Sequence, residues 1–206
     1  MKAKRLLSWL LCTAMLMTLV PAGVAFGAEA AVDVQKLTTY GRTYVDGGTL
    51  YLCWVNSGFS FRINGTGATA TLTATNANGI YKGYVNVYVD GSFEPTKTIC
   101  LEKLSDVYTL AEGLPAGEHT IEVRKRNEGG YDGTAVIGVK TLTVTGGDFL
   151  TPPAAPTRQI EFVGDSITTG FGNIAGPNDG YSTANSDGTM TYAVLAAKQL
   201  GAEAQV

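Results

Sequence analysis

Period-two alternation of apolar and polar residues, repeated from Val32 to Val144, limits the possible folds of this chain more than any other feature. A side-chain period of two is the repeat of a β-strand that buries one face and exposes the other. The clearest runs are residues 59–64, 69–74, 84–89, 120–124 and 141–144. We therefore predict an antiparallel β-sandwich over residues 31–148, with no helix in it.

Glycine-rich turn signals separate these runs. Asp90-Gly91, directly after the run at 84–89, is typical of a hairpin turn. The other signals are Asp46-Gly47-Gly48, Asn64-Gly65, Gly113 with Pro115 and Gly117, Gly129-Gly130, and Asp132-Gly133. Short alternating strands with frequent turns favour a sandwich over other all-β folds.

Composition limits the class of protein. With 206 residues, of which 45% are hydrophobic and 16% charged, the chain suits one or two globular domains and is not disordered. A formal net charge of −3 does not favour nucleic acid as a partner. We interpret the one basic run, Arg124-Lys125-Arg126, as a solvated strand end.

A proline-rich stretch divides the chain. Residues 149–157 read Phe-Leu-Thr-Pro-Pro-Ala-Ala-Pro-Thr, a stiff, extended connection that fits neither a sheet nor a helix. Residues 158–206 then predict a strand, a glycine-rich loop from Gly172 to Gly188, a helix from Thr191 to Leu200, and a second strand at 202–206. On the helix we expect one face formed by Tyr192, Leu195, Ala196 and Gln199. This order is the start of a doubly wound α/β sheet.

The strand that opens this second part leads into a serine. Residues 160–173 read Ile-Glu-Phe-Val-Gly-Asp-Ser-Ile-Thr-Thr-Gly-Phe-Gly-Asn. The apolar residues Ile160, Phe162 and Val163 predict a short buried strand, which Gly164 ends. Ligands of open α/β sheets bind at the carboxyl ends of the strands. Ser166 would there present its hydroxyl to a substrate and its backbone N–H to a developing oxyanion.

This stretch resembles block I of the SGNH (GDSL-type) hydrolases. The longer string, Gly-Asp-Ser-Ile-Thr-x-Gly-x-Gly-Asn, is most similar to carbohydrate esterase family 2, whose members remove acetyl groups from polysaccharides. Two segments of the first part, Trp54 to Gly67 and Leu114 to Val123, are similar to strands of the jelly-roll domain of that family. The resemblance implies a multi-domain protein, in which a jelly-roll sandwich precedes a flavodoxin-like SGNH hydrolase domain.

The resemblance also implies roles for single residues. Ser166 is the nucleophile, and its N–H contributes to the oxyanion hole. Gly164, Asp165, Gly172 and Asn173 support the turn, and we expect Asp165 to accept backbone N–H bonds. The catalytic base of the family comes from a late Asp-x-x-His or similar block, and a later glycine and asparagine complete its oxyanion hole.

These later blocks are absent from the 206 residues. The one histidine, His119, lies in Gly117-Glu118-His119-Thr120-Ile121, and we interpret it as a surface or edge-strand residue of the sandwich. A serine hydroxyl is a poor nucleophile without a base. We therefore expect this chain to be the N-terminal portion of a longer protein, truncated within the SGNH domain and inactive by itself.

The first thirty residues are typical of a secretory signal peptide. Lys2, Lys4 and Arg5 precede an uncharged run, which Pro21 and Gly23 interrupt before small residues suited to cleavage. The alternative is an uncleaved membrane anchor, because the uncharged run is long enough to span a bilayer. We expect cleavage and export, so that the mature protein has no membrane partner and is a secreted bacterial enzyme.

The sequence indicates neither a definite disulfide nor a metal site. After removal of the leader, Cys53 and Cys100 remain, either as a disulfide or as two small buried side chains. No spacing of histidine, cysteine and carboxylate indicates a metal site, and the implied reaction uses no cofactor. The sequence does not indicate an oligomeric state.

The sequence leads to two functional hypotheses from different classes. The first is a secreted serine esterase that removes acetyl groups from xylan or mannan, with Ser166 as nucleophile. The second is a carbohydrate-binding sandwich with a non-catalytic tail. Trp54, Phe171 and Tyr181 are candidates for stacking on sugar rings in either case, with ordinary packing as the other interpretation. A phosphate-binding loop at Gly164 is disfavoured, because the lysine of a P-loop is missing.

Overall fold

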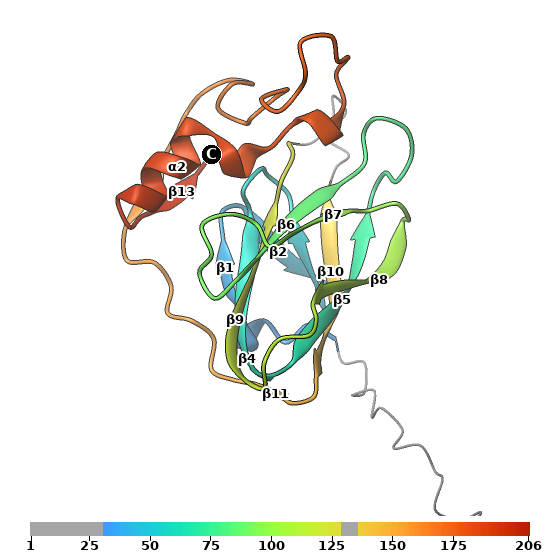
Figure 1. Ribbon diagram of the computed structural model, residues 1–206, viewed down its shortest axis with the longest axis vertical. Coiled ribbons are helices and arrows are strands. Elements are labelled where there is room, and N and C mark those ends of the chain that lie inside the picture. Colours follow the sequence, from blue (N-terminus) through green and yellow to red (C-terminus); the bar gives the residue numbers. More distant parts are fainter. Residues whose placement is uncertain (1–30, 129–135) are drawn as a thin grey trace, which may run out of the picture.

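The structure is a computed structural model that describes residues 31–128 and 136–206. Two antiparallel sheets form a sandwich, and residues 158–206 lie against one end and one outer face of it (Figure 1). The predicted leader at 1–30 and the predicted turns at Gly129-Gly130 and Asp132-Gly133 lie outside the described residues. The predicted antiparallel sandwich is confirmed.

The first sheet has the strand order β1-β4-β9-β6-β7, with β11 also pairing with β4. Its strands are β1 (Thr38–Tyr40), β4 (Gly58–Gly65), β6 (Tyr84–Val89), β7 (Lys97–Cys100), β9 (Gly117–Lys125) and β11 (Asp148–Phe149). β9 lies at the centre, with β4 on one side and β6 on the other. A short 3-10 helix, η1 (Val34–Lys36), precedes β1.

The second sheet has the order β2-β3-β10-β5-β8. Its strands are β2 (Thr43–Asp46), β3 (Thr49–Leu52), β5 (Gly67–Ala74), β8 (Ser105–Ala111) and β10 (Ile137–Thr145). β5 shows the predicted alternation directly, because Leu72 is buried in the core and its neighbours Thr71 and Thr73 are partly exposed. The alternation therefore predicts the inward face correctly.

The core lies between the two sheets. It contains the alternating apolar residues of both inner faces, among them Phe59, Phe61, Ile63, Leu72, Val85, Val87, Ile121, Val123, Ile137, Val139 and Leu142. Rings of Phe59 and Phe61 stack at a centroid distance of 6.0 Å, and Phe149 of β11 packs against Phe61 at 5.8 Å. Burial of this apolar area is the main stabilising contribution to the sandwich.

The predicted turn at Asp90-Gly91 is confirmed. Both residues have positive φ, 54° and 70°, and the N–H of Ser92 donates to the carbonyl of Val89 at 3.1 Å. Asp46-Gly47-Gly48 likewise joins β2 to β3. In both places the turn residues tolerate the left-handed backbone that a tight reversal requires.

The proline-rich connection runs back along the sandwich, from β11 to the segment at its other end (Figure 1). Phe149, the first residue of the stretch, still pairs with Ile63 of β4 because it precedes the prolines and keeps its N–H. The hydroxyl of Thr38 donates to the carbonyl of Pro153, which holds the connection against β1. The domain division itself stays a prediction.

Residues 158–206 form two parallel strands with a helix between them. β12 (Gln159–Glu161) pairs with β13 (Glu203–Gln205), and α2 (Tyr192–Gln199) lies between them in sequence. Two 3-10 turns, η2 (Thr183–Asn185) and η3 (Gly188–Met190), precede the helix. Thr191 caps α2 by accepting from the N–H of Val194. The predicted strand, helix and second strand are present in the predicted order.

Two details of this segment were predicted wrongly. The buried face of α2 is formed by Ala193, Val194 and Ala197, whereas Tyr192 is exposed, because small residues let the helix approach the two strands closely. The strand before the serine is not buried, since β12 pairs with β13 alone among the described strands and Val163 is 93% exposed.

The outer face of β9 is covered, which corrects the interpretation of the basic run. Arg124 and Arg126 are each 7% exposed and Lys125 is fully buried. Arg124 and Arg126 point outward, against residues 158–206, while Lys125 follows Ile121 and Val123 on the inward side. Burial lowers the pKa of Lys125 to about 7, and its ammonium donates to the carbonyl of Asn127.

Arg124 joins the sandwich to β13. Its guanidinium donates to both carboxylate oxygens of Glu203, at 2.5 and 2.8 Å, and to the carbonyl of Asn56 at 3.1 Å. Its Nε donates to Glu122 at 2.7 Å, and the ring of Tyr40 lies 3.9 Å away. Burial opposes the charged form, but the two carboxylates outweigh it and raise the pKa of Arg124.

In the described part of the chain, no helix has both the length and the apolar character needed to cross a membrane.

Replacing Glu203 with glutamine tests this contact. We expect the free energy of unfolding to fall by about 3 kcal/mol, because a buried arginine loses one of its two charged partners. Urea unfolding measures the loss, and hydrogen exchange of the β13 amides locates it. Glu161→Gln is the matched control, since its 3.9 Å pair with Arg42 is exposed on both sides. Equal stability of the two variants would contradict the assignment.

Candidate functional site

Ser166 lies on a compact turn, residues 164–171, that follows β12. The turn closes through the N–H of Thr168, which donates to the carbonyl of Asp165 at 3.0 Å, and the N–H of Phe171, which donates to the carbonyl of Ser166 at 2.9 Å. Ser166 itself is exposed. The sequence prediction of a serine at the tip of a strand-to-turn junction therefore matches the local structure.

Asp165 and Ser166 have different environments within this turn. The carboxylate of Asp165 accepts from the N–H of Ile167 at 3.0 Å, which is the local bond expected of an Asx residue. Within the described residues, neither the hydroxyl nor the backbone N–H of Ser166 forms a hydrogen bond. Both groups are thus available to a ligand, while Asp165 is engaged in holding the backbone.

Gly164 is required by a close approach. A Cβ at this position would lie 2.0 Å from the hydroxyl oxygen of Thr168, which is itself buried and bonded to the hydroxyl of Tyr192 at 2.8 Å. The turn also reaches the sandwich, because the hydroxyl of Thr169 donates to the carboxylate of Glu128 at 2.8 Å. These contacts hold the serine turn between α2 and the end of β9.

Gly172 and Asn173 connect the turn to residues 185–188. The N–H of Gly172, which has a φ of +66°, donates to the hydroxyl of Ser186 at 3.0 Å. The side chain of Asn173 pairs twice with the backbone of Asp187: its amide donates to the carbonyl at 2.9 Å and its oxygen accepts from the N–H at 2.8 Å. Both residues therefore fix the loop that follows Ser166.

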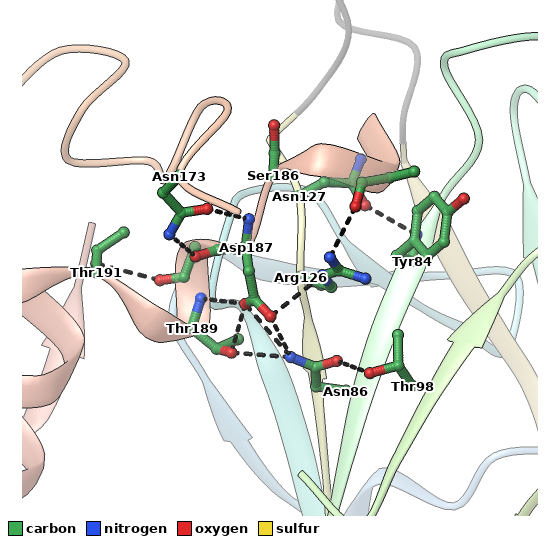
Figure 2. A network of polar contacts seen from close by, with 12 residues as sticks. Tyr84, Asn86, Thr98, Arg126, Asn127, Asn173, Ser186, Asp187, Thr189 and Thr191 are labelled. Carbon is green, nitrogen blue, oxygen red and sulfur yellow. Dashed lines mark hydrogen bonds and ion pairs between the residues drawn. The ribbon is translucent and has the colours of Figure 1, made fainter. Parts of the chain in front are cut away.

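Asp187 is the centre of a buried polar network, which Figure 2 shows from close by. Its carboxylate accepts from the amide of Asn86 at 3.0 Å, and from the N–H and hydroxyl of Thr189 at 3.0 and 2.6 Å. It also forms an ion pair with Nε of Arg126 at 3.2 Å. The backbone pairs with Asn173 and the side chain with the sandwich, so Asp187 couples the serine turn to β6 and β9.

The sequence analysis did not single out Asp187. The signal was present, because Asp187-Gly188-Thr189 places an acceptor and a hydroxyl two residues apart in a polar loop, as in other Asx turns. Its partners Asn86 and Arg126 are more than fifty residues away in sequence, and no local pattern indicates that pairing. Gly188 allows this loop to lie close to the sandwich, since a Cβ at this position would lie 1.9 Å from a methyl group of Val55.

The candidate aromatic residues lie at two separate places in the structure. Phe171 and Tyr181 stack at 4.2 Å with an interplanar angle of 7°, and Tyr81 of the sandwich lies 6.2 Å from Tyr181. Phe171 ends the serine turn and is partly exposed, so this pair lies on the loop that follows Ser166. Trp54 lies elsewhere on the sandwich, half exposed beneath the guanidinium of Arg42 at 5.5 Å.

His119 is engaged on the sandwich and does not meet Ser166. It lies at the start of β9, a central strand, and not on an edge strand. Its Nδ1 is 2.7 Å from the carboxylate of Asp90, and its Nε2 is 2.8 Å from the carbonyl of Pro115. These two acceptors, Asp90 first, raise the pKa of His119 above its ordinary value.

The two cysteines are free thiols, and burial raises the pKa of Cys53. Among residues 31–128 and 136–206, no three histidine, cysteine, aspartate or glutamate side chains gather in a group that could hold a metal ion. The candidate site therefore consists of an exposed serine, its free N–H, and the polar loop that fixes them.

Fold and site together define a class: a β-sandwich protein whose following βαβ segment presents a serine on a turn. Comparison with known proteins agrees with this class. The family model described as "Carbohydrate esterase 2 N-terminal" matches residues 39–153 of the chain. Because this match covers more than half of the sequence, the chain belongs to carbohydrate esterase family 2.

The similarity to individual relatives extends over more residues than this match. An acetylxylan esterase / glucomannan deacetylase of Cellvibrio japonicus is 29% identical over 179 residues, which are 85% of this chain and 47% of that protein. The chain thus spans about half the length of this curated relative. A family two carbohydrate esterase structure from Cellvibrio japonicus superimposes with a TM-score of 0.73 at 26% identity, covering 86% of this chain and 50% of the other.

A second solved structure carries a ligand. It is a family two carbohydrate esterase from Clostridium thermocellum in complex with cellohexaose, with a TM-score of 0.73 and 25% identity, covering 82% of this chain and 50% of the other. These likenesses support the recognition made from the serine string and the sandwich strands.

Replacing Asp187 with asparagine tests the coupling between sandwich and serine turn. The new amide would face the donors of Asn86 and Arg126, so a buried cation loses its partner. We expect the free energy of unfolding to fall by about 3–5 kcal/mol in urea titrations. The control Asp179→Asn alters an exposed carboxylate bonded to the N–H of Gly176 and should change stability by less than about 0.5 kcal/mol. A similar small effect for both variants would show that Asp187 is not needed for docking.

An NMR titration of His119 tests its pairing, and assignment is simple because the chain has one histidine. We expect an imidazole pKa above 6.5, with a shift back toward 6.5 in Asp90→Asn and no shift in the control Asp106→Asn. Because the folded-state pKa is raised, the pair stabilises the fold fully below the unfolded pKa. That contribution is lost as pH rises through the folded pKa. A pKa at or below 6.5 in the parent would rule out the charged pair.

Proposed function

We propose that this chain carries the nucleophile of an exported serine esterase that removes acetyl groups from plant cell-wall polysaccharide of the xylan or mannan type. Family membership supports the reaction class, and the name of the Cellvibrio japonicus relative supports the substrates. The leader-like residues 1–30 support export. The reaction needs no cofactor.

The observation that carries this proposal is the state of Ser166. It is exposed on a fixed turn after β12, and its hydroxyl and N–H make no hydrogen bond with any described residue. In the reaction, Oγ attacks the acetyl carbonyl and loses its proton to a base. The oxygen of the tetrahedral intermediate then accepts from the N–H of Ser166, and collapse of the intermediate expels the sugar oxygen, which takes up the proton from the base and leaves as an alcohol. Water releases acetate from the acyl-enzyme.

We place the catalytic base and the remaining oxyanion donors outside these 206 residues. His119 is held by Asp90 and Pro115 at the start of β9, and no other histidine is present in the sequence. The parallel pair of β12 and β13, with α2 between them, fits the start of an SGNH-type α/β sheet, which the whole protein would complete.

The stacked pair of Phe171 and Tyr181 is the proposed contact for the sugar chain next to Ser166. Its rings are 4.2 Å apart and come from the loop that begins at the serine turn. A pyranose presents an apolar face of C–H groups, which packs well on an aromatic ring. Substitution of Phe171 or Tyr181 would therefore affect substrate binding more than the chemical step.

Replacing Ser166 with alanine in the full-length protein is the direct test. Acetate release from acetylated xylan should fall by at least about a thousandfold, because the nucleophile is removed. The melting temperature should stay unchanged, since the hydroxyl makes no hydrogen bond. Ser182→Ala, which removes a hydroxyl that does not cap η2, is the matched control and should keep full activity.

Activity near the parent level in Ser166→Ala would exclude Ser166 as nucleophile. Serine-dependent acetate release by the 206 residues alone would contradict the placement of the base outside them.

A further inference from the structure

A cavity lies between the sandwich and α2, and the serine turn contributes nothing to it. It has a volume of about 270 Å³ and is lined by Tyr88, Gly91, Ser92, Phe93, Glu122 and Lys198. Tyr88 and Glu122 are cross-strand partners on β6 and β9 and form its floor. The turn after β6 forms one wall and Lys198 of α2 the other. Docking of residues 158–206 therefore creates this cavity.

The side chains of the cavity offer both hydrogen-bond donors and acceptors. The ammonium of Lys198 is 3.4 Å from the carbonyl of Phe93 and lies 4.5 Å from the ring centre of Tyr88. Burial lowers the pKa of Lys198. One carboxylate oxygen of Glu122 accepts from Arg124, which leaves the other for a ligand.

The aromatic residue of the cavity is Phe93, whose large ring is 51% exposed. An aromatic ring beside a small group of polar side chains is typical of a specific small-molecule site.

The charges limit the kind of ligand. An anion would be repelled by Glu122, and a cation would be repelled by Lys198 and the neighbouring Arg124. Hydroxyl groups of an uncharged polyol both donate and accept, so they satisfy Glu122 and Lys198 together. The C–H face of a pyranose would pack on Phe93. The volume is just below the roughly 300–1,000 Å³ of sites for drug-sized ligands, which suits one sugar ring.

We propose that this cavity is a secondary binding site for one uncharged sugar ring of the polysaccharide, separate from Ser166. The inference rests on the proposed polysaccharide substrate. It adds a contact that holds the chain to its substrate without taking part in the reaction. Because both the sandwich and α2 line the cavity, the site requires the two parts to be docked.

Isothermal titration calorimetry of the full chain with unacetylated xylohexaose and mannohexaose tests the site. We expect the parent to bind at least one of the two. Phe93→Ala should weaken binding by about tenfold, through loss of the packed ring. Lys198→Met should weaken it by about twofold to tenfold, because it removes the ammonium that lies at the cavity.

Tyr44→Ala is the matched control, because Tyr44 is also 51% exposed but lies on β2 of the other sheet; it should bind as the parent does. The proposal is overturned if the parent binds neither sugar, if Phe93→Ala and Lys198→Met both bind normally, or if Phe171→Ala alone removes binding. Acetate release is measured separately on Ser166→Ala, so failure of the esterase proposal and failure of this site give different results.

Discussion

The structure depends on the neutralisation of Arg124, a cation buried on the outer face of the central strand β9. A buried charge is tolerated when partners surround it. Glu122 comes from the same strand, whereas Glu203 comes from β13, seventy-nine residues later in the chain. The pair thus requires residues 158–206 to return to the sandwich. The position of the serine turn and of α2 against the sandwich follows from that return, and so does the cavity between α2 and β6.

A second buried contact sets the position of the serine turn more closely. Asp187 accepts from Asn86 and Thr189, pairs with Arg126, and is held through its backbone by Asn173. Arg124 anchors the strands of the segment, and Asp187 anchors its loop. With two anchors on adjacent strands of one sheet, the loop has little freedom to rotate, which is a requirement for presenting a nucleophile in a fixed direction.

Sequence alone could predict the sandwich, the order of elements after the prolines, and the place of Ser166, because each rests on local signals. Alternation identifies Phe59, Phe61 and Ile63 as inward, and Gly164-Asp165-Ser166 marks a strand end. The docking of residues 158–206 against the sandwich could not be predicted. Arg124-Lys125-Arg126 reads as a solvated strand end because the partners that bury it are distant in sequence. The inward face of α2, formed by Ala193, Val194 and Ala197, is likewise set by the strands that the helix covers.

All strands of the sandwich lie within residues 38–149, and β12 and β13 follow them in the chain. As long as residues 158–206 have not docked, Arg124 and Arg126 face water, where a charge has no desolvation cost. Docking buries these two cations against Glu203 and Asp187. The side chains that hold the serine segment in place therefore also keep this face of the sandwich polar before docking.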